Sequence, residues 1–392
     1  MLYTEIGQMY SVHQHWDPLR VCVVGRSYSP NFYNYIENSK VRDVFYQIAE
    51  ETEEDYQKLI QILQSFGVRV IRPTISDNYH DYLLSGNNKI LPPPMTPRDY
   101  CAMIGNKFYL SNQYNKINTK TIWNKISGST WPRCPETPHE FNQLPNDIKK
   151  ELQHHFNISI FNDLLYNNCY EDLVNDLEAH NNVIDYSTNI NSAQVTRIGK
   201  DLYFGTVEGS VFDKKYANSL IPSLSDYRCH VVDMEGHADG TFCPVKPGLI
   251  VSLRDIPTYK DTFPDWEVVY LPYQSWDQVR PFLDLKSKNK GKWWVPGHEL
   301  NDEFTQYVET WMSNWVGYVE ETVFDVNMLV IDENNVICNN YNEQVFRAFE
   351  RHNITPHVVN FRHRYFWDGG LHCITADIHR EGNQKDYFPW RD

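Results

Sequence analysis

Two segments of the sequence place a reactive side chain among small residues beside an apolar stretch. Residues 235–242 contain His237, and residues 368–375 contain Cys373. Small flanking residues let the backbone approach a ligand closely, which is typical of a site segment. A Cys with a distant His is the pattern of a nucleophile and its proton-transfer partner, although a single Cys is more often only a buried core residue. The sequence therefore indicates thiol-dependent chemistry, with a structural cysteine as the alternative.

Zinc binding is a competing use of the same atoms. His237, Asp239, His372 and Cys373 all have side chains of a type that binds zinc. The spacing disfavours such a site, because the chain has no H-E-x-x-H or C-x-x-C pattern and the adjacent His372 and Cys373 on a strand would point to opposite faces. Residues 236–240 also lack the G-x-G-x-x-G order of a phosphate-binding loop. We therefore expect neither a metal nor a cofactor.

The composition narrows the class of protein. The 392 residues are 41% apolar and 14% aromatic, which is enough for a buried core, and their formal net charge is −15. This charge, without a compensating basic stripe, disfavours nucleic-acid binding. The eight cysteines are widely spread and lie mostly in apolar stretches, as reduced thiols do. The chain has no run of 18 apolar residues and no basic segment leading into an apolar one, so we expect a cytoplasmic protein without membrane contact.

A repeated local pattern is the main indication of the fold. A polar or reactive residue precedes an apolar strand, a turn with Gly or Asn follows, and a second apolar strand comes next. The residues that open these units are Asp99, Asn191, His237, Asp325 and Cys373, of which the last opens a shorter, terminal unit. Hairpins and helices arranged around a pseudo-symmetric centre would bring the five together. Unrelated hairpins are the alternative, because turn glycines are common in any α/β protein.

The first seventy residues predict a strand, a helix and a second strand. Apolar residues recur at helical spacing over residues 44–66, and Gly67 stands where a C′ glycine would end the helix. Residues 19–25 and 68–71 are apolar and typical of strands.

One segment does not follow the repeat. Residues 111–185 are rich in Asn and predict two helices, near residues 146–155 and 170–180. We therefore expect a single catalytic domain over residues 1–392, with an insert at about 111–185.

Several short motifs follow one another in an order that spans nearly the whole chain. They are Trp16-Asp17-Pro18-Leu19 with Val23-Val24-Gly25-Arg26, Pro97-Arg98-Asp99 with Ile104-Gly105-Asn106, Arg197-Ile198-Gly199-Lys200-Asp201, His237-Ala238-Asp239-Gly240-Thr241-Phe242, and Gly369-Gly370-Leu371-His372-Cys373. Together they resemble the ordered motifs of the glycine amidinotransferase family. That family belongs to the guanidino-modifying enzymes of pentein fold. The resemblance thus implies an α/β propeller of five ββαβ-type modules with pseudo-fivefold symmetry.

The resemblance also implies roles for four side chains. Cys373 would be the nucleophile, His237 the general acid and base, and Asp99 with Asp239 the carboxylates that hold a guanidinium. Cys373 would take the amidino group of L-arginine, ornithine would leave, and an amine acceptor (glycine or a bulkier amine) would then receive the group with ping-pong kinetics. The residue types suit this chemistry, because a planar guanidinium matches carboxylates and a thiolate is accessible beside a cation.

The chain departs from the family at the residue that orients the histidine. Asn191 falls where the family has a carboxylate, and Gln194 falls at a second acidic position. An Asn accepts a hydrogen bond but has no charge to stabilise imidazolium, and the equivalent change in a serine-protease triad costs about 10⁴ in rate. Asp185 or Glu208 is the alternative orienting group.

Three positions bear on the substrates. Gly236 leaves room for an acceptor bulkier than glycine. Asp325 stands where relatives have Ser, which would favour a cationic acceptor or only cap a hairpin. Arg254 is a candidate partner of a substrate carboxylate, and its alternative is an ordinary surface residue.

Two other functions stay open. One is a hydrolase of the same fold that acts on arginine or a related guanidine and gives citrulline. The other is a catalytically dead module that binds a guanidino ligand, which Asn191 favours and the retained Cys373 and His237 disfavour. In either case the expected partners are small molecules, and a homodimer is compatible with the sequence.

Overall fold

Five short sheets, all built in the same way, form the framework of the chain in a computed structural model. The structure describes residues 9–83, 89–110, 140, 143–150, 169–186, 188–210, 212–233, 237–253, 258–271, 293–316 and 323–391. In each sheet the middle strand pairs antiparallel with one neighbour and parallel with the other. The fold is therefore of mixed α/β type.

Each sheet consists of neighbouring strands in a fixed spatial order. The five orders are β15 (Thr375–Arg380), β1 (Leu19–Val24) and β2 (Arg69–Ile71); β3 (Cys101–Ile104), β4 (Lys107–Leu110) and β5 (Val183–Asp185); β6 (Val195–Ile198), β7 (Asp201–Thr206) and β8 (Arg228–Asp233); β11 (Glu267–Tyr270), β10 (Leu249–Ser252) and β9 (Phe242–Lys246); and β12 (Leu329–Asp332), β13 (Asn335–Cys338) and β14 (Thr355–Val358).

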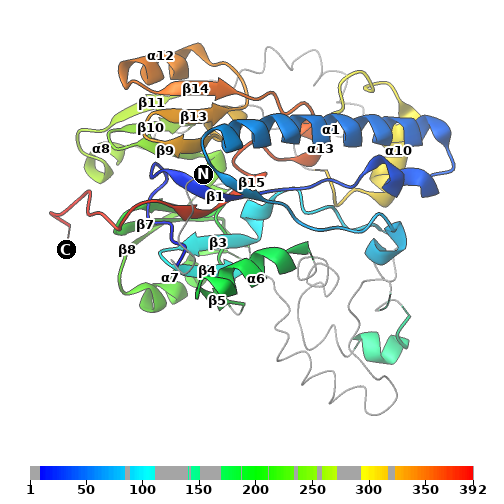
Figure 1. Cartoon of the computed structure of the whole chain (residues 1–392), viewed down its shortest axis with the longest axis horizontal. Helices are drawn as coiled ribbons and strands as arrows, with labels where there is room; N and C mark the ends of the chain where they lie inside the picture. Colours follow the sequence, from blue (N-terminus) through cyan, green and yellow to red (C-terminus); the bar gives the residue numbers. More distant parts are fainter. Residues whose placement is uncertain are drawn as a thin grey trace.

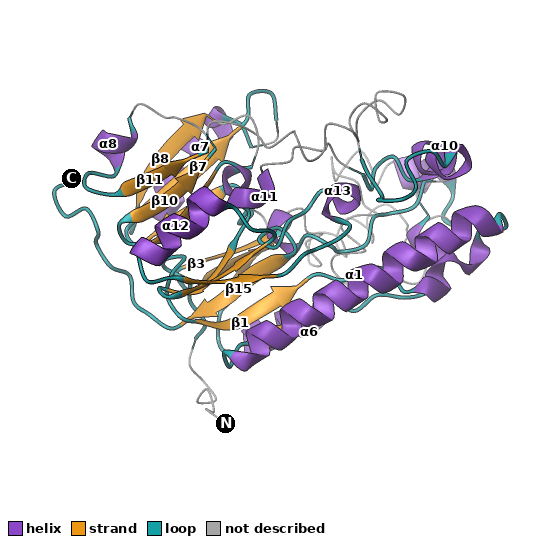
Figure 2. Cartoon of the chain, turned by 90° about the horizontal axis from the view of Figure 1, so that it is seen from above, coloured by secondary structure: helices purple, strands orange, loops and turns teal. Residues whose placement is uncertain are grey.

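Along the chain, a helix connects the two parallel strands of every sheet, because a parallel pair needs a long crossover connection. These helices are α1 (Ser39–Ser65), α6 (Glu171–Ala179), α7 (Lys214–Leu220), α8 (Tyr259–Thr262) and α12 (Glu343–Arg351). The other described helices are α10 (Asp302–Trp311), α11 (Val323–Val326) and α13 (Arg364–Trp367), with 3-10 turns η1 (Pro30–Tyr35), η2 (Tyr79–Tyr82), η3 (Pro97–Asp99), η4 (Ile221–Leu224) and η5 (Ala238–Gly240). Figure 1 shows α1 crossing one side of the molecule beside α10, and Figure 2 shows it outside the strands.

The predicted hairpin turns are confirmed. Ile104 pairs with Lys107 and Ile198 with Asp201, so each turn contains two residues. Gly105 and Gly199 open these turns with φ of +57° and +63°, a conformation that a residue with a Cβ adopts only with strain. The sequence therefore located both turns correctly.

The two ends of the chain complete one sheet together. β15 follows Cys373 and pairs antiparallel with β1, where Cys22 faces Asp377. The short terminal unit that Cys373 opens thus has its second strand at the other end of the sequence. This pairing explains why no second strand follows Cys373 along the chain.

The predicted first helix is confirmed as α1. The side chain of Asn38 accepts from the Lys40 N–H and caps its start, and an apolar stripe that includes Val44, Ile48 and Leu59 is buried. Gly67 follows with φ of +76°, and its N–H donates to the Gln64 carbonyl. The helix ends there as expected.

The segment expected as an insert lies partly outside the described residues. Residues 111–139 and 151–168 lie outside the described residues. Residues 146–150, at the start of the first expected helix, are helical. The second expected helix is α6, and β5 after it pairs parallel with β4. The end of the segment therefore contributes a helix and a strand to the second sheet.

A buried cluster of charges lies where several sheets meet. Asp377 of β15 is hydrogen-bonded by the Arg197 Nη2 at 2.8 Å to both carboxylate oxygens and by the Arg380 Nε at 2.8 Å. The Arg98 Nη1 lies 3.2 Å from Asp377 Oδ1, and all four side chains are at most 1% exposed. Burial opposes ionisation of Asp377, but the three guanidinium groups hold its pKa well below its usual range.

Asp377→Asn should lower the free energy of unfolding by about 3–5 kcal/mol, because it leaves three buried cations without their counter-charge. The stabilisation that depends on the Asp377 charge should be present above the ordinary carboxyl pKa and lost as the pH falls through the lowered one. Urea unfolding at several pH values measures both effects.

The control for this variant is Glu381→Gln. Glu381 pairs with Arg20 at the surface, where its side chain is 65% exposed, so its loss should cost less than about 1 kcal/mol. Equal stabilities of the two variants would contradict a structural role for the buried cluster.

Candidate active site

The candidate residues share one position in the fold, directly before the first strand of a sheet. Asp99 ends η3 before β3, and Asp239 lies in η5 before β9, with His237 as the N-cap of η5. Cys373 lies between α13 and β15. Because these segments are loops held by rigid sheets, their side chains can meet without contributing to the ladders.

Cys373 is buried, and polar groups surround its sulfur. The Asn327 Nδ2 donates to the Cys373 Sγ at 3.0 Å, and the Asp239 Oδ2 lies 3.5 Å from the same sulfur. Burial, together with the charges of Asp239 and Asp99, raises the pKa of the Cys373 thiol well above its ordinary value. Without a cation beside it, Cys373 is therefore a thiol near neutral pH, rather than the accessible thiolate that the sequence suggested.

Asp239 is fixed through one of its two oxygens. Its Oδ2 pairs with the His372 Nδ1 at 2.8 Å and accepts from the Asn327 Nδ2 at 3.3 Å. Its Oδ1 is buried and has no hydrogen-bond partner. Burial raises the pKa of Asp239, but the hydrogen bond from His372 and the charges of His237 and Arg98 outweigh it and lower the pKa overall. The site thus contains an ionised carboxylate with one oxygen free to accept.

Asp99 is the carboxylate beside His237. The Asp99 Oδ1 lies 3.6 Å from the His237 Nδ1 and, although buried, has no hydrogen-bond partner. Burial raises the pKa of Asp99. Burial lowers the pKa of His237, but the carboxylates of Asp99, Asp239 and Asp368 together raise it above its ordinary value. His237 is therefore disposed to carry a proton.

Two buried carboxylate oxygens without hydrogen-bond donors indicate which kind of ligand the site could bind. A buried carboxylate oxygen without a donor is costly, because it loses water and gains no hydrogen bond. Asp99 and Asp239 each present one such oxygen. A ligand that is cationic and carries several N–H donors would satisfy both.

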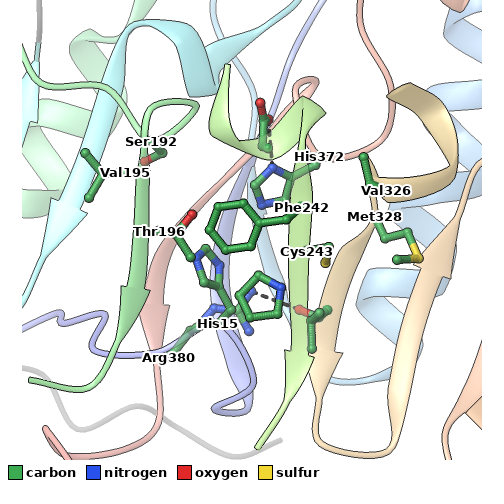
Figure 3. Close-up of a pocket in the computed structure, with 13 residues that line it drawn as sticks. His15, Ser192, Val195, Thr196, Phe242, Cys243, Val326, Met328, His372 and Arg380 are labelled. Atoms are coloured by element: carbon green, nitrogen blue, oxygen red, sulfur yellow. Dashed lines mark hydrogen bonds and ion pairs between the residues drawn. The ribbon is translucent and has the colours of Figure 1, made fainter. Parts of the chain in front are cut away.

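Asp239 and His372 also line a small internal cavity. The cavity has a volume of ≈ 10 Å³, room for about one water, and His15 is another of its lining residues (Figure 3). Burial and the charge of Arg98 lower the pKa of His372 to about 4. A neutral His372 keeps its single proton on Nδ1, where the Asp239 carboxylate accepts it.

The remaining predicted residues have other surroundings. Asn191 accepts from the Gln194 N–H at 3.1 Å through its Oδ1, and Asp99, not Asn191, lies beside His237. Asp325 accepts from the side chains of Asn340 and Asn342, which are the contacts of a hairpin cap. Arg254 and Gly236 lie outside the described residues.

The sequence did not indicate that Asn327 would contact the Cys373 sulfur or that His372 would pair with Asp239. Asn327 directly precedes the apolar strand that starts at Met328, so the rule of a polar residue before a strand would have selected it rather than Asp325. His372 was considered only as a zinc ligand. Within the described residues, no group of three or more His, Cys, Asp and Glu side chains is arranged to hold a metal ion. The helices of the described ranges include none long and apolar enough to cross a membrane.

Known proteins with similar sequences are amidinotransferases. The mitochondrial glycine amidinotransferase of Xenopus tropicalis is 22% identical over 96% of this chain and 84% of its own length. Inosamine-phosphate amidinotransferase 1 of Streptomyces glaucescens is 23% identical over 97% and 99%. No protein-family model matches the chain.

Solved structures with the same fold are also amidinotransferases. SxtG, an amidinotransferase from Microseira wollei in the saxitoxin biosynthetic pathway, superposes with a TM-score of 0.61 at 16% identity, over 97% of this chain and 99% of that one. The inosamine-phosphate amidinotransferase StrB1 of Streptomyces griseus gives a TM-score of 0.60 with the same identity and coverage. Sequence and fold agree over nearly the whole length, so the chain is similar in sequence to amidinotransferases and shares their fold.

Proposed function

We propose that this protein moves the amidino group of L-arginine to an amine acceptor through a covalent amidino-Cys373 intermediate and releases ornithine. The observation that carries the proposal is that two carboxylates close to Cys373, the half-buried Asp99 and the buried Asp239, each have one buried oxygen without a hydrogen-bond donor. A guanidinium supplies a positive charge and N–H donors in a planar fork, which is what these oxygens lack.

Binding would prepare the thiol as well as the substrate. The carboxylates of Asp239 and Asp99 oppose formation of the Cys373 thiolate in the empty site. A guanidinium between them offsets both charges, so the pKa of Cys373 falls when the substrate is present. The thiolate then forms mainly in the complex, with its proton released to solvent because His237 already carries one, and the guanidinium carbon that it attacks is already held in place.

The transfer follows in two half-reactions. The Cys373 Sγ attacks the central guanidinium carbon, and the tetrahedral adduct collapses as His237 gives its proton to the leaving δ-nitrogen of ornithine. An amine acceptor, glycine or a bulkier amine, then gives a proton to His237 and attacks the S-amidino carbon. The C–S bond breaks and the thiolate is restored, which gives ping-pong kinetics.

Asp99 replaces Asn191 as the charge beside His237 in this mechanism. The Asn191 Oδ1 is engaged by the Gln194 N–H, whereas Asp99 is the first of the carboxylates that raise the pKa of His237. Asp99 would then have two roles, because it would accept hydrogen bonds from the guanidinium and would stabilise the imidazolium of His237. Asp325 would act as a hairpin cap, and Arg254 stays a proposed partner of a substrate carboxylate.

The fold supports one further proposal about the architecture. The same ββαβ order occurs in all five sheets. We take residues 1–392 as one catalytic domain in which these five modules surround a pseudo-fivefold axis, with an insert between β4 and α6.

The first test is product analysis. The protein is incubated with L-arginine, with and without a panel of amines, and ornithine, citrulline and guanidinylated products are followed by mass spectrometry. Ornithine that forms only with an acceptor is the expected result, and Cys373→Ala should lower turnover on the order of 10⁶-fold, as loss of a nucleophile does elsewhere.

Cys229→Ala is the matched control, because Cys229 is a half-buried thiol on β8 and should be dispensable. Citrulline without an acceptor would instead identify a hydrolase, and neither product would favour a binding module. Turnover retained by Cys373→Ala would exclude the covalent mechanism.

The second test uses the pH dependence of kcat/KM. Activity should fall at low pH as Asp99, whose pKa is raised, takes up a proton, and at high pH as His237 loses its proton above a raised pKa. Asp99→Asn removes the leading cause of the raised His237 pKa, so the alkaline limb should move to lower pH and kcat/KM should drop about 10²-fold or more.

Asp368→Asn serves as the control, since Asp368 is the weakest of the three carboxylates that raise the pKa of His237. NMR titration of the His237 imidazole reports the same shift without substrate. An alkaline limb that moves equally in both variants would argue against the Asp99–His237 pair.

A further inference from the structure

Two buried asparagines hold the turn that carries Cys373. The Asn327 Oδ1 accepts from the backbone N–H groups of His372 at 2.9 Å and Cys373 at 3.2 Å. The Asn339 Oδ1 accepts from the Leu371 N–H at 3.1 Å, and its Nδ2 donates to the Asn327 carbonyl at 2.7 Å. Both side chains are at most 1% exposed, so the turn is fixed from the β12–β13 hairpin.

The amide of Asn327 has only one possible orientation. Its oxygen faces two backbone donors, and a flipped amide would place N–H groups against N–H groups. Its Nδ2 must therefore point to the other side, where the Cys373 Sγ lies at 3.0 Å and the Asp239 Oδ2 at 3.3 Å. The hydrogen bonds from the two backbone N–H groups therefore orient the Asn327 Nδ2 toward the Cys373 sulfur.

The sulfur needs such a donor. Burial and two carboxylates oppose a negative charge on Cys373, and hydrogen bonds from Asn327 and from the Gly370 backbone act in the opposite direction. Among the side chains of the described ranges, Asn327 is the one that donates to this sulfur. A hydrogen bond to an ionised group is about twice as strong as one between neutral groups, so this donor favours the thiolate over the thiol.

We propose that Asn327 is a catalytic residue that stabilises the Cys373 thiolate through its Nδ2 while its Oδ1 fixes the direction of the sulfur. Its part in turnover rests on the proposed function, but its effect on the thiol does not. The thiol can therefore be examined without substrate.

The test compares Asn327→Leu with Asn339→Leu. Both replace a buried Asn of the same turn with a side chain of similar shape, but only the first removes the donor to sulfur. The rate of Cys373 alkylation by iodoacetamide is measured from pH 7 to 10 on the peptide that contains Cys373, by mass spectrometry, and thermal unfolding reports the loss of the clamp in each variant.

Loss of the donor should raise the thiol pKa by about one unit, which reduces the thiolate tenfold at a given pH. The remaining thiolate is more nucleophilic, with a Brønsted slope of about 0.4–0.5, so alkylation below the pKa should be about threefold slower than in Asn339→Leu. Equal pH profiles in the two leucine variants would overturn the proposal, because loosening of the turn alone would explain them.

Asn327→Asp provides a second variant should the leucine proteins not fold. It keeps an oxygen for the two backbone N–H groups and lacks the amide donor, so its alkylation profile should move to higher pH, and an unchanged profile would overturn the proposal. A shifted profile in a protein that forms no ornithine would sink the proposed function alone. Ornithine formation with unshifted profiles would sink the role of Asn327 alone.

Discussion

The ion cluster around Asp377 is the constraint on which both the fold and the site depend. Three arginines against one carboxylate leave a buried excess of positive charge, and each arginine also donates to at least one backbone carbonyl. Arg380 reaches the carbonyl of Val330 in β12, and Arg197 that of Met103 in β3. Arg98 donates to the carbonyls of His372 and Thr375, on either side of the Cys373 turn. The cluster that joins the sheets therefore also fixes the turn that contains Cys373.

The carboxylates of the candidate site oppose one another and the thiolate. Asp99 and Asp239 each bury an oxygen without a donor, and both raise the pKa of the Cys373 thiol. Such unpaired groups cost stability, and they persist only because the surrounding structure fixes them. The hydrogen bond from His372 and the charge of Arg98 hold Asp239 ionised, while Asp99 raises the pKa of His237 beside it. In the proposed function, a guanidinium would offset these charges together and supply the missing donors.

The sequence predicted what depends on neighbouring residues. Glycines in the sequence located the hairpin turns, where the structure gives them positive φ. The apolar stripe and Gly67 located α1. The sequence did not predict which distant segments contact each other. His372 meets Asp239 across 133 positions, and Arg197 meets Asp377 across 180. A charged residue within an apolar strand signals a buried ion pair, but only the relative placement of two sheets decides its partner. Asn191 shows the same limit, because alignment fixed its place in the repeat and not the group that its side chain contacts.

The repeat explains why the side chain just before a strand has such influence. The residues before β3, β9, β12 and β15 lie at the site, and the side chain at this position determines what each sheet contributes. Asp99 supplies charge, Asn327 supplies a donor to the sulfur and an acceptor for the turn, and Cys373 supplies the proposed nucleophile. Asp325 lies two residues before Asn327, and its oxygens are taken up by Asn340 and Asn342. Within one module, a shift of two residues therefore separates a side chain that stabilises the hairpin from one that touches the reacting sulfur.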